Sequence, residues 1–205
     1  MKEILILGAG SVAKPHARYL LNQNFHVTIA SRTVSKAEKI AGKKGKALEL
    51  NVKNDEALEK LVKSADLVVS LLPYIYHVKV ANYCIEHGKD MVTTSYVSDS
   101  MNQLDGKAKE TGIILLNETG IDPGIDHMSA MKIIHDVHKK GGKISSFYSY
   151  CGGLPAPEAN TNPFGYKFSW SPRGVLLAGK NSAKYLKDGK VVKVSSEKLF
   201  NHYWL

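Results

Sequence analysis

The sequence has 205 residues, 43% hydrophobic and 23% charged, a composition that supports a packed core and argues against a disordered chain. Its formal net charge of +9 indicates attraction to anions, whether phosphorylated small molecules, nucleic acid or acidic lipid. The lysines are spread along the chain without a tight basic block, so no nucleic-acid-binding arm is predicted.

The cysteines and the amino-terminal segment indicate the cellular compartment in which the protein is expected. Cys84 and Cys151 are too few for a disulfide framework and have no zinc-binding spacing. The apolar run over residues 4–7 ends at Gly8, far short of the roughly 20 apolar residues of a membrane span, and it does not resemble a secretory signal. We therefore expect a soluble cytoplasmic protein that has no nucleic-acid or membrane partner and holds no metal ion.

Short apolar runs alternate with segments of helical periodicity along the first half of the chain. Strands are predicted over 4–7, 26–30, 46–50, 65–72, 91–94 and 113–116, and helices over 12–22, 34–43, 55–63, 78–87 and 103–111. Residues 4–7 lack polar alternation, which is typical of a strand buried on both faces of a parallel sheet. The pattern predicts the α/β class, with a Rossmann-type doubly wound parallel sheet forming a dinucleotide-binding domain over residues 1–120.

The pattern changes after residue 120. A turn is predicted over 122–127, a helix over 128–140, a half-exposed strand over 145–150, an edge strand over 166–171 and a hairpin whose turn is Asp188-Gly189. A glycine- and proline-rich stretch at 152–163 separates two of these segments. We expect residues 121–205 to be part of a second α+β domain that serves substrate binding or dimerisation.

A glycine-rich turn follows the first predicted strand and opens the first predicted helix. Gly8, Gly10 and Ala13 occupy the three small-residue positions of the dinucleotide-binding fingerprint. The first glycine allows the tight turn, the second lets a pyrophosphate approach the backbone, and the alanine keeps the helix close to the strand. The amides at the start of the helix attract phosphate, so this turn predicts a bound nicotinamide dinucleotide.

The tip of the second strand selects the dinucleotide. NAD usually meets a carboxylate there, whereas this chain has Ser31, Arg32 and Thr33. An arginine side chain suits the 2′-phosphate of NADP, and Lys36 adds a second positive charge nearby. We expect NADP rather than NAD, although a surface arginine that ends a strand is the structural alternative.

The later strand tips carry further candidates. Leu72 follows the fourth strand and would line the cofactor, although a plain strand end explains it equally well. Thr94, Ser95 and Tyr96 follow the fifth strand and could donate to a carboxylate or carboxamide, with a satisfied turn as the alternative.

Two glycine-containing runs lie beyond the sixth strand. Asp122 sits inside a Pro-Gly turn and is the candidate catalytic residue, placed to meet a substrate amine. His127 could transfer protons, but a lone histidine in a first helical turn is more often structural. Cys151 has no neighbouring base, which argues against a nucleophile, whereas the amides of Gly152 and Gly153 could form an anion-binding nest.

Several long strings resemble the glutamate-forming saccharopine dehydrogenases. They include Asp-Pro-Gly-Ile-Asp-His from Asp122, Cys-Gly-Gly-Leu-Pro-Ala-Pro-Glu from Cys151 and Tyr-Lys-Phe-Ser-Trp-Ser from Tyr166. The resemblance implies an oxidoreductase of lysine metabolism that uses NADPH to reduce the imine of L-glutamate and 2-aminoadipate 6-semialdehyde to saccharopine, or runs in reverse. We also expect a homodimer.

The resemblance also implies site residues. The cofactor is expected to contact Gly8, Ala9, Gly10, Ser11, Val12, Ser31, Arg32, Thr33, Asn51, Val52, Leu72, Thr94, Ile121, Asp122, Pro123 and Ser171. The substrate is expected to contact Ser95, Tyr96, Asp122, Cys151 and Gly152.

The chain departs from the family in length. Family members are expected to be more than twice as long, with the arginines that hold the substrate carboxylates beyond Leu205. We therefore interpret the chain as truncated at its carboxyl end, keeping cofactor affinity but with little or no dehydrogenase activity alone. Two alternatives stay open: a related imine-reducing enzyme of the carboxynorspermidine dehydrogenase type, and a non-catalytic nucleotide-binding or nucleic-acid-binding module.

Overall fold

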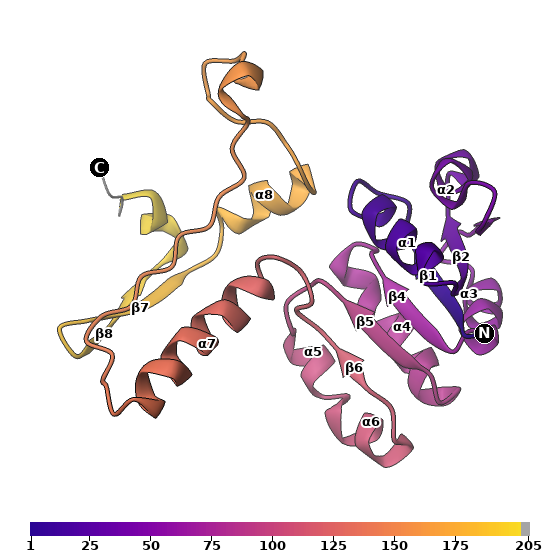
Figure 1. The fold of residues 1–205 in the computed structure, drawn as a ribbon, viewed down its shortest axis with the longest axis horizontal. Coiled ribbons are helices and arrows are strands. Elements are labelled where there is room, and N and C mark those ends of the chain that lie inside the picture. Colours follow the sequence, from indigo (N-terminus) through magenta and orange to yellow (C-terminus); the bar gives the residue numbers. More distant parts are fainter. Residues whose placement is uncertain (202–205) are drawn as a thin grey trace. The chain divides into compact units, whose positions relative to one another are not determined.

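The computed structural model describes residues 1–201, drawn as a ribbon in Figure 1. The contacts divide the chain into two compact units, Met1–Cys151 and the part from Gly152 onward. The boundary predicted at residue 120 falls earlier in the chain. Within the described residues, no helix has the length and apolar content that a membrane span requires.

The first unit contains a six-stranded sheet in which all neighbouring strands are parallel. The strands run in the order β3-β2-β1-β4-β5-β6, the order of a doubly wound dinucleotide-binding sheet. Their bounds are β1 Glu3–Leu7, β2 His26–Ser31, β3 Lys46–Glu49, β4 Leu67–Ser70, β5 Asp90–Thr93 and β6 Leu115–Leu116. The Rossmann-type prediction is confirmed. The direction of winding reverses between β1 and β4, where ligands bind in such sheets.

Helices connect the strands. Those of the first unit are α1 Ala13–Asn22, α2 Val34–Ala41, α3 Asp55–Ser64, α4 His77–Glu86, α5 Asp99–Asn102, α6 Asp105–Thr111 and α7 Ile125–Lys139, with one turn of 3₁₀-helix at Tyr74–Tyr76. The short α5, begun by the side chain of Ser98 accepting from the Met101 N–H, was not predicted. The helix predicted over 128–140 begins three residues earlier, so Asp126 and His127 lie in its first turn.

The sheet is buried on both faces, as the apolar strand sequences predicted. Leu5 and Leu7 of β1 pack in one core cluster with residues of α3 and α4, including Leu58 and Val80. The alternate residues of β1, such as Ile6, pack in a second cluster with residues of α1 and α2. Each buried leucine or isoleucine contributes about 1.5–3 kcal/mol to folding. The strands are therefore held rigidly, and their carboxyl ends form one fixed edge.

The second unit is built around one antiparallel hairpin. Strands β7 Ala183–Lys187 and β8 Lys190–Val194 pair across Asp188 and Gly189, both at positive φ, which confirms the predicted turn. The unit also contains α8 Pro172–Ala178 and 3₁₀ turns at Pro157–Ala159 and Ser196–Asn201.

Two predicted strands were wrong. Residues 145–150 and 166–171 have no strand structure, and no strand among residues 1–201 pairs with them. Their alternating side chains suit a strand, but an isolated segment without a neighbouring strand cannot form the ladder of hydrogen bonds that stabilises one. Residues 166–171 instead lead into α8, where the aromatic ring of Trp170 packs against Gly174.

Candidate functional site

The glycine turn after β1 has different steric surroundings at its two glycines. Gly8 has a φ of +110°, and a Cβ added there would lie 2.9 Å from the carbonyl oxygen of Leu71, which follows β4. A Cβ added at Gly10 would meet nothing within 4 Å. Gly8 is therefore required by the fold itself, whereas Gly10 leaves open space at the surface where a diphosphate can approach.

The start of α1 is available to an anion. Val12 occupies the cap position, and no side chain in residues 1–201 accepts a hydrogen bond at this helix start. Val12 is half-exposed and Ser11 is exposed, so the surface around the first turn is open. A helix start without a side-chain cap has unsatisfied amides and a partial positive charge, the two features that bind a phosphate.

The tips of β2 and β3 lie side by side. Ser31 ends β2, its carbonyl accepts from the N–H of Leu50, and its hydroxyl accepts from the N–H of Thr33. Arg32 between them is exposed and so can reach a ligand phosphate. These contacts place Arg32 at the carboxyl edge of the sheet, as predicted, one strand away from the glycine turn.

The loop after β3 is held by α4. The ammonium of Lys79 donates to the carbonyl of Val52 at 3.0 Å and pairs with Asp55, which starts α3. Asn51 is exposed beside the buried Val52, and its side-chain oxygen accepts from the N–H of Lys53. The predicted contact residues Asn51 and Val52 thus belong to a loop whose conformation is held by the contacts of Lys79 on α4.

The segments after β5 and β6 meet at the same edge. The Tyr96 hydroxyl donates to Asp122 Oδ1 at 2.9 Å, although the two residues are 26 positions apart. The carboxylate of Glu118 accepts from the N–H of Val97, and Gly120 lies against Thr94. The structure therefore brings together the substrate residues predicted from two different strand tips.

The chemistry of this group is set by the carboxylate of Asp122. Burial and the hydrogen bond to Asp122 raise the pKa of Tyr96 to about 12, so the phenol stays protonated at neutral pH. Hydrogen bonding to the same carboxylate raises the pKa of the Cys151 thiol. A protonated thiol is a poor nucleophile, which agrees with the sequence argument against that role. The group offers a carboxylate that accepts from the neutral phenol of Tyr96, a setting that suits a cationic amine.

His127 does not join this group through a hydrogen bond. Its Nδ1 contacts Oδ1 of the preceding residue, Asp126, at 2.8 Å, and its side chain is largely exposed. The hydrogen bond to Asp126 raises the pKa of His127. This local pair is the structural arrangement expected for a histidine in a first helical turn.

A buried histidine at the start of α4 was not predicted from the sequence. His77 is 3% exposed, and its Nδ1 lies 2.9 Å from the Ser70 hydroxyl at the end of β4. Its Nε2 lies 2.8 Å from the Ser95 hydroxyl and 3.1 Å from the Thr93 hydroxyl at the end of β5. A signal was present, because polar residues that end buried strands need partners. The sequence spacing did not show which residue would be the hydrogen-bond partner of these strand-end hydroxyls.

Burial lowers the pKa of His77 from 6.5 to about 4, so the ring is neutral in the folded protein at pH 7. The unfolded chain binds this proton at higher pH than the folded chain, so folding stability falls as the pH decreases from 6.5 toward 4. We expect His77→Gln to remove about 2 kcal/mol of the acid-induced loss between pH 7 and 4.5. Denaturant unfolding at several pH values measures this, with the exposed His138→Gln as control. If the free energy of unfolding of His77→Gln fell with decreasing pH as steeply as that of the wild type, the lowered pKa would not belong to His77.

Two predicted site residues lie in the second unit: Ser171, expected at the cofactor, and Gly152, expected at the substrate. These two roles stay predictions. The hydroxyl of Ser171 accepts from the N–H of Gly174 and thereby starts α8. That hydrogen bond gives Ser171 a local structural function. A Cβ at Gly152 would meet nothing within 4 Å, so its backbone is open on one side.

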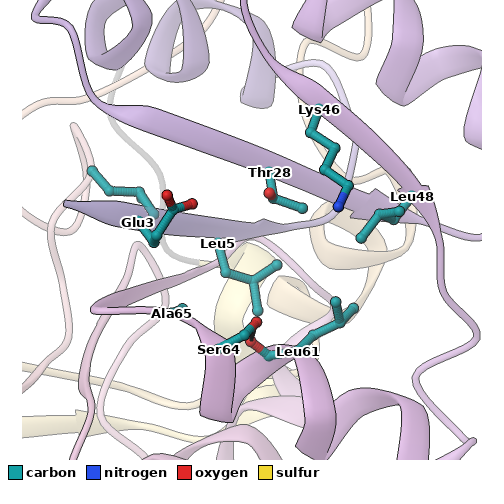
Figure 2. A pocket seen from close by; sticks show the side chains of 9 residues that line it. Glu3, Leu5, Thr28, Lys46, Leu48, Leu61, Ser64 and Ala65 are labelled. Atoms are coloured by element: carbon teal, nitrogen blue, oxygen red, sulfur yellow. Dashed lines mark hydrogen bonds between the residues drawn. The ribbon is translucent and has the colours of Figure 1, made fainter. Parts of the chain in front are cut away.

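A shallow cavity of about 310 Å³ lies elsewhere on the sheet (Figure 2). It is lined near the amino end of β1 by Glu3 and Leu5, and by Ser64 and Ala65 at the end of α3. Because the strands are parallel, this end of the sheet is opposite to the glycine turn. The cavity is therefore separate from the cofactor site.

One group of side chains has the spacing of metal ligands. Glu59 of α3, Glu86 of α4 and His87 just after α4 bring ligand atoms within 4.8 Å of one another. His87 Nε2 lies 3.0 Å from Glu59 Oε1, so a hydrogen bond between the end of α4 and α3 accounts for the grouping. It lies away from the strand tips, since His87 follows the far end of α4.

The strand order and the glycine turn define a Rossmann-type dinucleotide-binding domain. Residues 4–116 match the family model of the saccharopine dehydrogenase NADP binding domain, and residues 120–204 match that of the saccharopine dehydrogenase C-terminal domain. The chain belongs to the saccharopine dehydrogenase family, and NADP is the dinucleotide of its first domain.

Comparison with individual proteins supports the same family. The chain is 52% identical to saccharopine dehydrogenase [NADP(+), L-glutamate-forming] of Schizosaccharomyces pombe, over 97% of this chain and 45% of that protein. It is 44% identical to alpha-aminoadipic semialdehyde synthase of Arabidopsis thaliana, over 97% of this chain and 21% of that protein. The solved apo saccharopine dehydrogenase (L-Glu forming) from Saccharomyces cerevisiae matches with a TM-score of 0.88 and 48% identity, over all of this chain and 47% of that one. The chain thus spans less than half the length of these relatives.

Proposed function

We propose that this chain is the cofactor-binding part of an NADP-dependent oxidoreductase that acts on the secondary amine of saccharopine. In the synthetic direction, L-glutamate and 2-aminoadipate 6-semialdehyde lose water to form an imine, which gains a hydride and a proton to become saccharopine. The reduced nicotinamide supplies the hydride when NADPH is bound. A homodimer and a cytoplasmic location belong to the same proposal; the location is inferred from the small number of cysteines.

The observation that carries the proposal is the hydrogen bond between Tyr96 and Asp122 at the carboxyl edge of the sheet that also presents the glycine turn. The carboxylate attracts the positive charge of a substrate amine or protonated imine, and Tyr96 holds that carboxylate in one orientation. The open space at Gly10 and the uncapped start of α1 support a diphosphate site there, and the exposed Arg32 at the tip of β2 supports recognition of the 2′-phosphate. The protein supplies placement and charge.

The test separates cofactor binding from chemistry. We expect saturable NADPH binding by fluorescence, saccharopine binding with a Kd on the order of millimolar, and steady-state turnover far below that of a full-length relative. Asp122→Asn should weaken saccharopine binding about tenfold, as expected for losing one charged partner, and should weaken NADPH binding less, because the cofactor is expected to contact Asp122 without depending on its charge. The neighbouring Asp126→Asn is the matched control.

Other outcomes would redirect the assignment. Turnover near that of a full-length relative would refute the expectation that the chain alone is nearly inactive. Binding of a carboxylated polyamine in preference to saccharopine would favour the carboxynorspermidine dehydrogenase type. A steep salt dependence of binding to DNA, without saccharopine binding, would favour a nucleic-acid-binding module.

A further inference from the structure

The ring of His77 joins the ends of two neighbouring strands to the loop that follows them. Its Nδ1 faces Ser70 of β4, and its Nε2 faces Thr93 of β5 and Ser95 just beyond it. The hydroxyl residues Ser70 and Thr93 are 0% and 1% exposed, whereas Ser95 is only half-buried. Ser95 is therefore the member of this network that can meet a ligand.

The backbone at Ser95 is already fixed on both sides. Its N–H donates to the Thr93 hydroxyl oxygen at 3.4 Å, and its carbonyl accepts from the N–H of Glu118 at 3.1 Å. What stays free is rotation of the Ser95 side chain, which can adopt three staggered positions. The contact with His77 Nε2 selects one of them, because the buried ring cannot turn without losing its bond to Ser70.

A neutral imidazole has one N–H and one lone pair, so its two nitrogens differ. The Ser70 hydroxyl can donate or accept, so it pairs with Nδ1 in either tautomer and keeps the ring in place. Nε2 therefore faces the Ser95 hydroxyl at 2.8 Å in either tautomer and fixes where that oxygen lies. The hydroxyl is directed before any ligand arrives, and this reduces the entropy lost on binding.

We propose that His77 is a positioning residue that holds the Ser95 hydroxyl in the orientation that recognises the amino-acid substrate. The inference rests on the proposed function and deepens it. Ser95 precedes Tyr96, whose phenol donates to Asp122, so the oriented hydroxyl and the phenol that holds the carboxylate come from adjacent positions of one loop. Because His77 is only 3% exposed, it acts on the ligand through Ser95.

Two substitutions separate the two sides of the ring. The amide of His77→Gln extends about as far as Nε2 and can replace the contact with Ser95, whereas the shorter His77→Asn reaches only the position of Nδ1 and Ser70. NADPH-loaded protein is titrated with saccharopine and followed by amide chemical shifts. We expect His77→Asn to weaken saccharopine binding about fivefold, as for one lost hydrogen bond, and His77→Gln to stay near wild type. NADPH affinity should not change in either variant. Equal effects, or none, would overturn the proposal.

A second measurement does not depend on substrate or on the fold of the His77 variants. In protein labelled with ¹⁵N-histidine, Ser95→Ala should shift the Nε2 resonance of His77 more than its Nδ1 resonance. An unchanged Nε2 resonance would show that the ring does not hold Ser95 and would overturn the proposal. If wild-type protein binds NADPH but no saccharopine, the proposed function fails for this chain, while the labelled ring still decides whether His77 positions Ser95.

Discussion

Gly10→Ala is expected to weaken NADPH binding at least about tenfold and to leave the fold as stable as before. The added methyl group would contact nothing in the protein within 4 Å. It would instead occupy the space through which the diphosphate approaches the backbone, and a tenfold loss corresponds to about 1.4 kcal/mol. Fluorescence titration with NADPH and thermal unfolding measure the two quantities.

The matched variant Gly8→Ala makes the same chemical change two residues earlier. Its Cβ would lie 2.9 Å from the Leu71 carbonyl oxygen, on a backbone with a φ of +110°. Steric overlap and the unfavourable φ together cost about 3 kcal/mol or more, which lowers the melting temperature by roughly 10 °C. If Gly10→Ala were as destabilising as Gly8→Ala, or bound NADPH normally, the division of roles between the two glycines would be wrong.

Arg32→Asp is expected to reverse the preference for NADP over NAD. The substitution removes the cation at the tip of β2 and places there the carboxylate that NAD-binding sheets present to the ribose hydroxyls. Losing a charge-assisted hydrogen bond and gaining repulsion should lower NADP affinity about 100-fold, which corresponds to about 2.8 kcal/mol. Calorimetry with both dinucleotides measures the ratio.

Arg18→Asp is the control for this change. Arg18 is exposed on α1, and the substitution alters the net charge by the same amount without touching a strand tip. It should lower the affinities for NADP and NAD modestly, by long-range electrostatics that salt screens. If Arg32→Asp left the ratio of the two affinities unchanged, Arg32 would not bind the 2′-phosphate.

The first half of the chain was predictable because its signals are local. A strand covered on both faces has to be apolar throughout, so residues 4–7 and their counterparts were found to within a few residues. Helix ends were set by local side chains, such as that of Asn54, which accepts from the Ala57 N–H at the start of α3. The strands predicted at 145–150 and 166–171 failed because alternation describes only one strand of a pair.

The sequence by itself determined the order of strands and helices, the glycine turn and the positive residue at the tip of β2. Each of these depends on a few consecutive residues and on the handedness of parallel crossovers. Only the tertiary structure decided that Tyr96 reaches Asp122, 26 residues away, and that His77 reaches Ser95, 18 residues away. Such contacts depend on which strands become neighbours and on where each strand ends and its loop begins, and these are set by packing across the whole sheet.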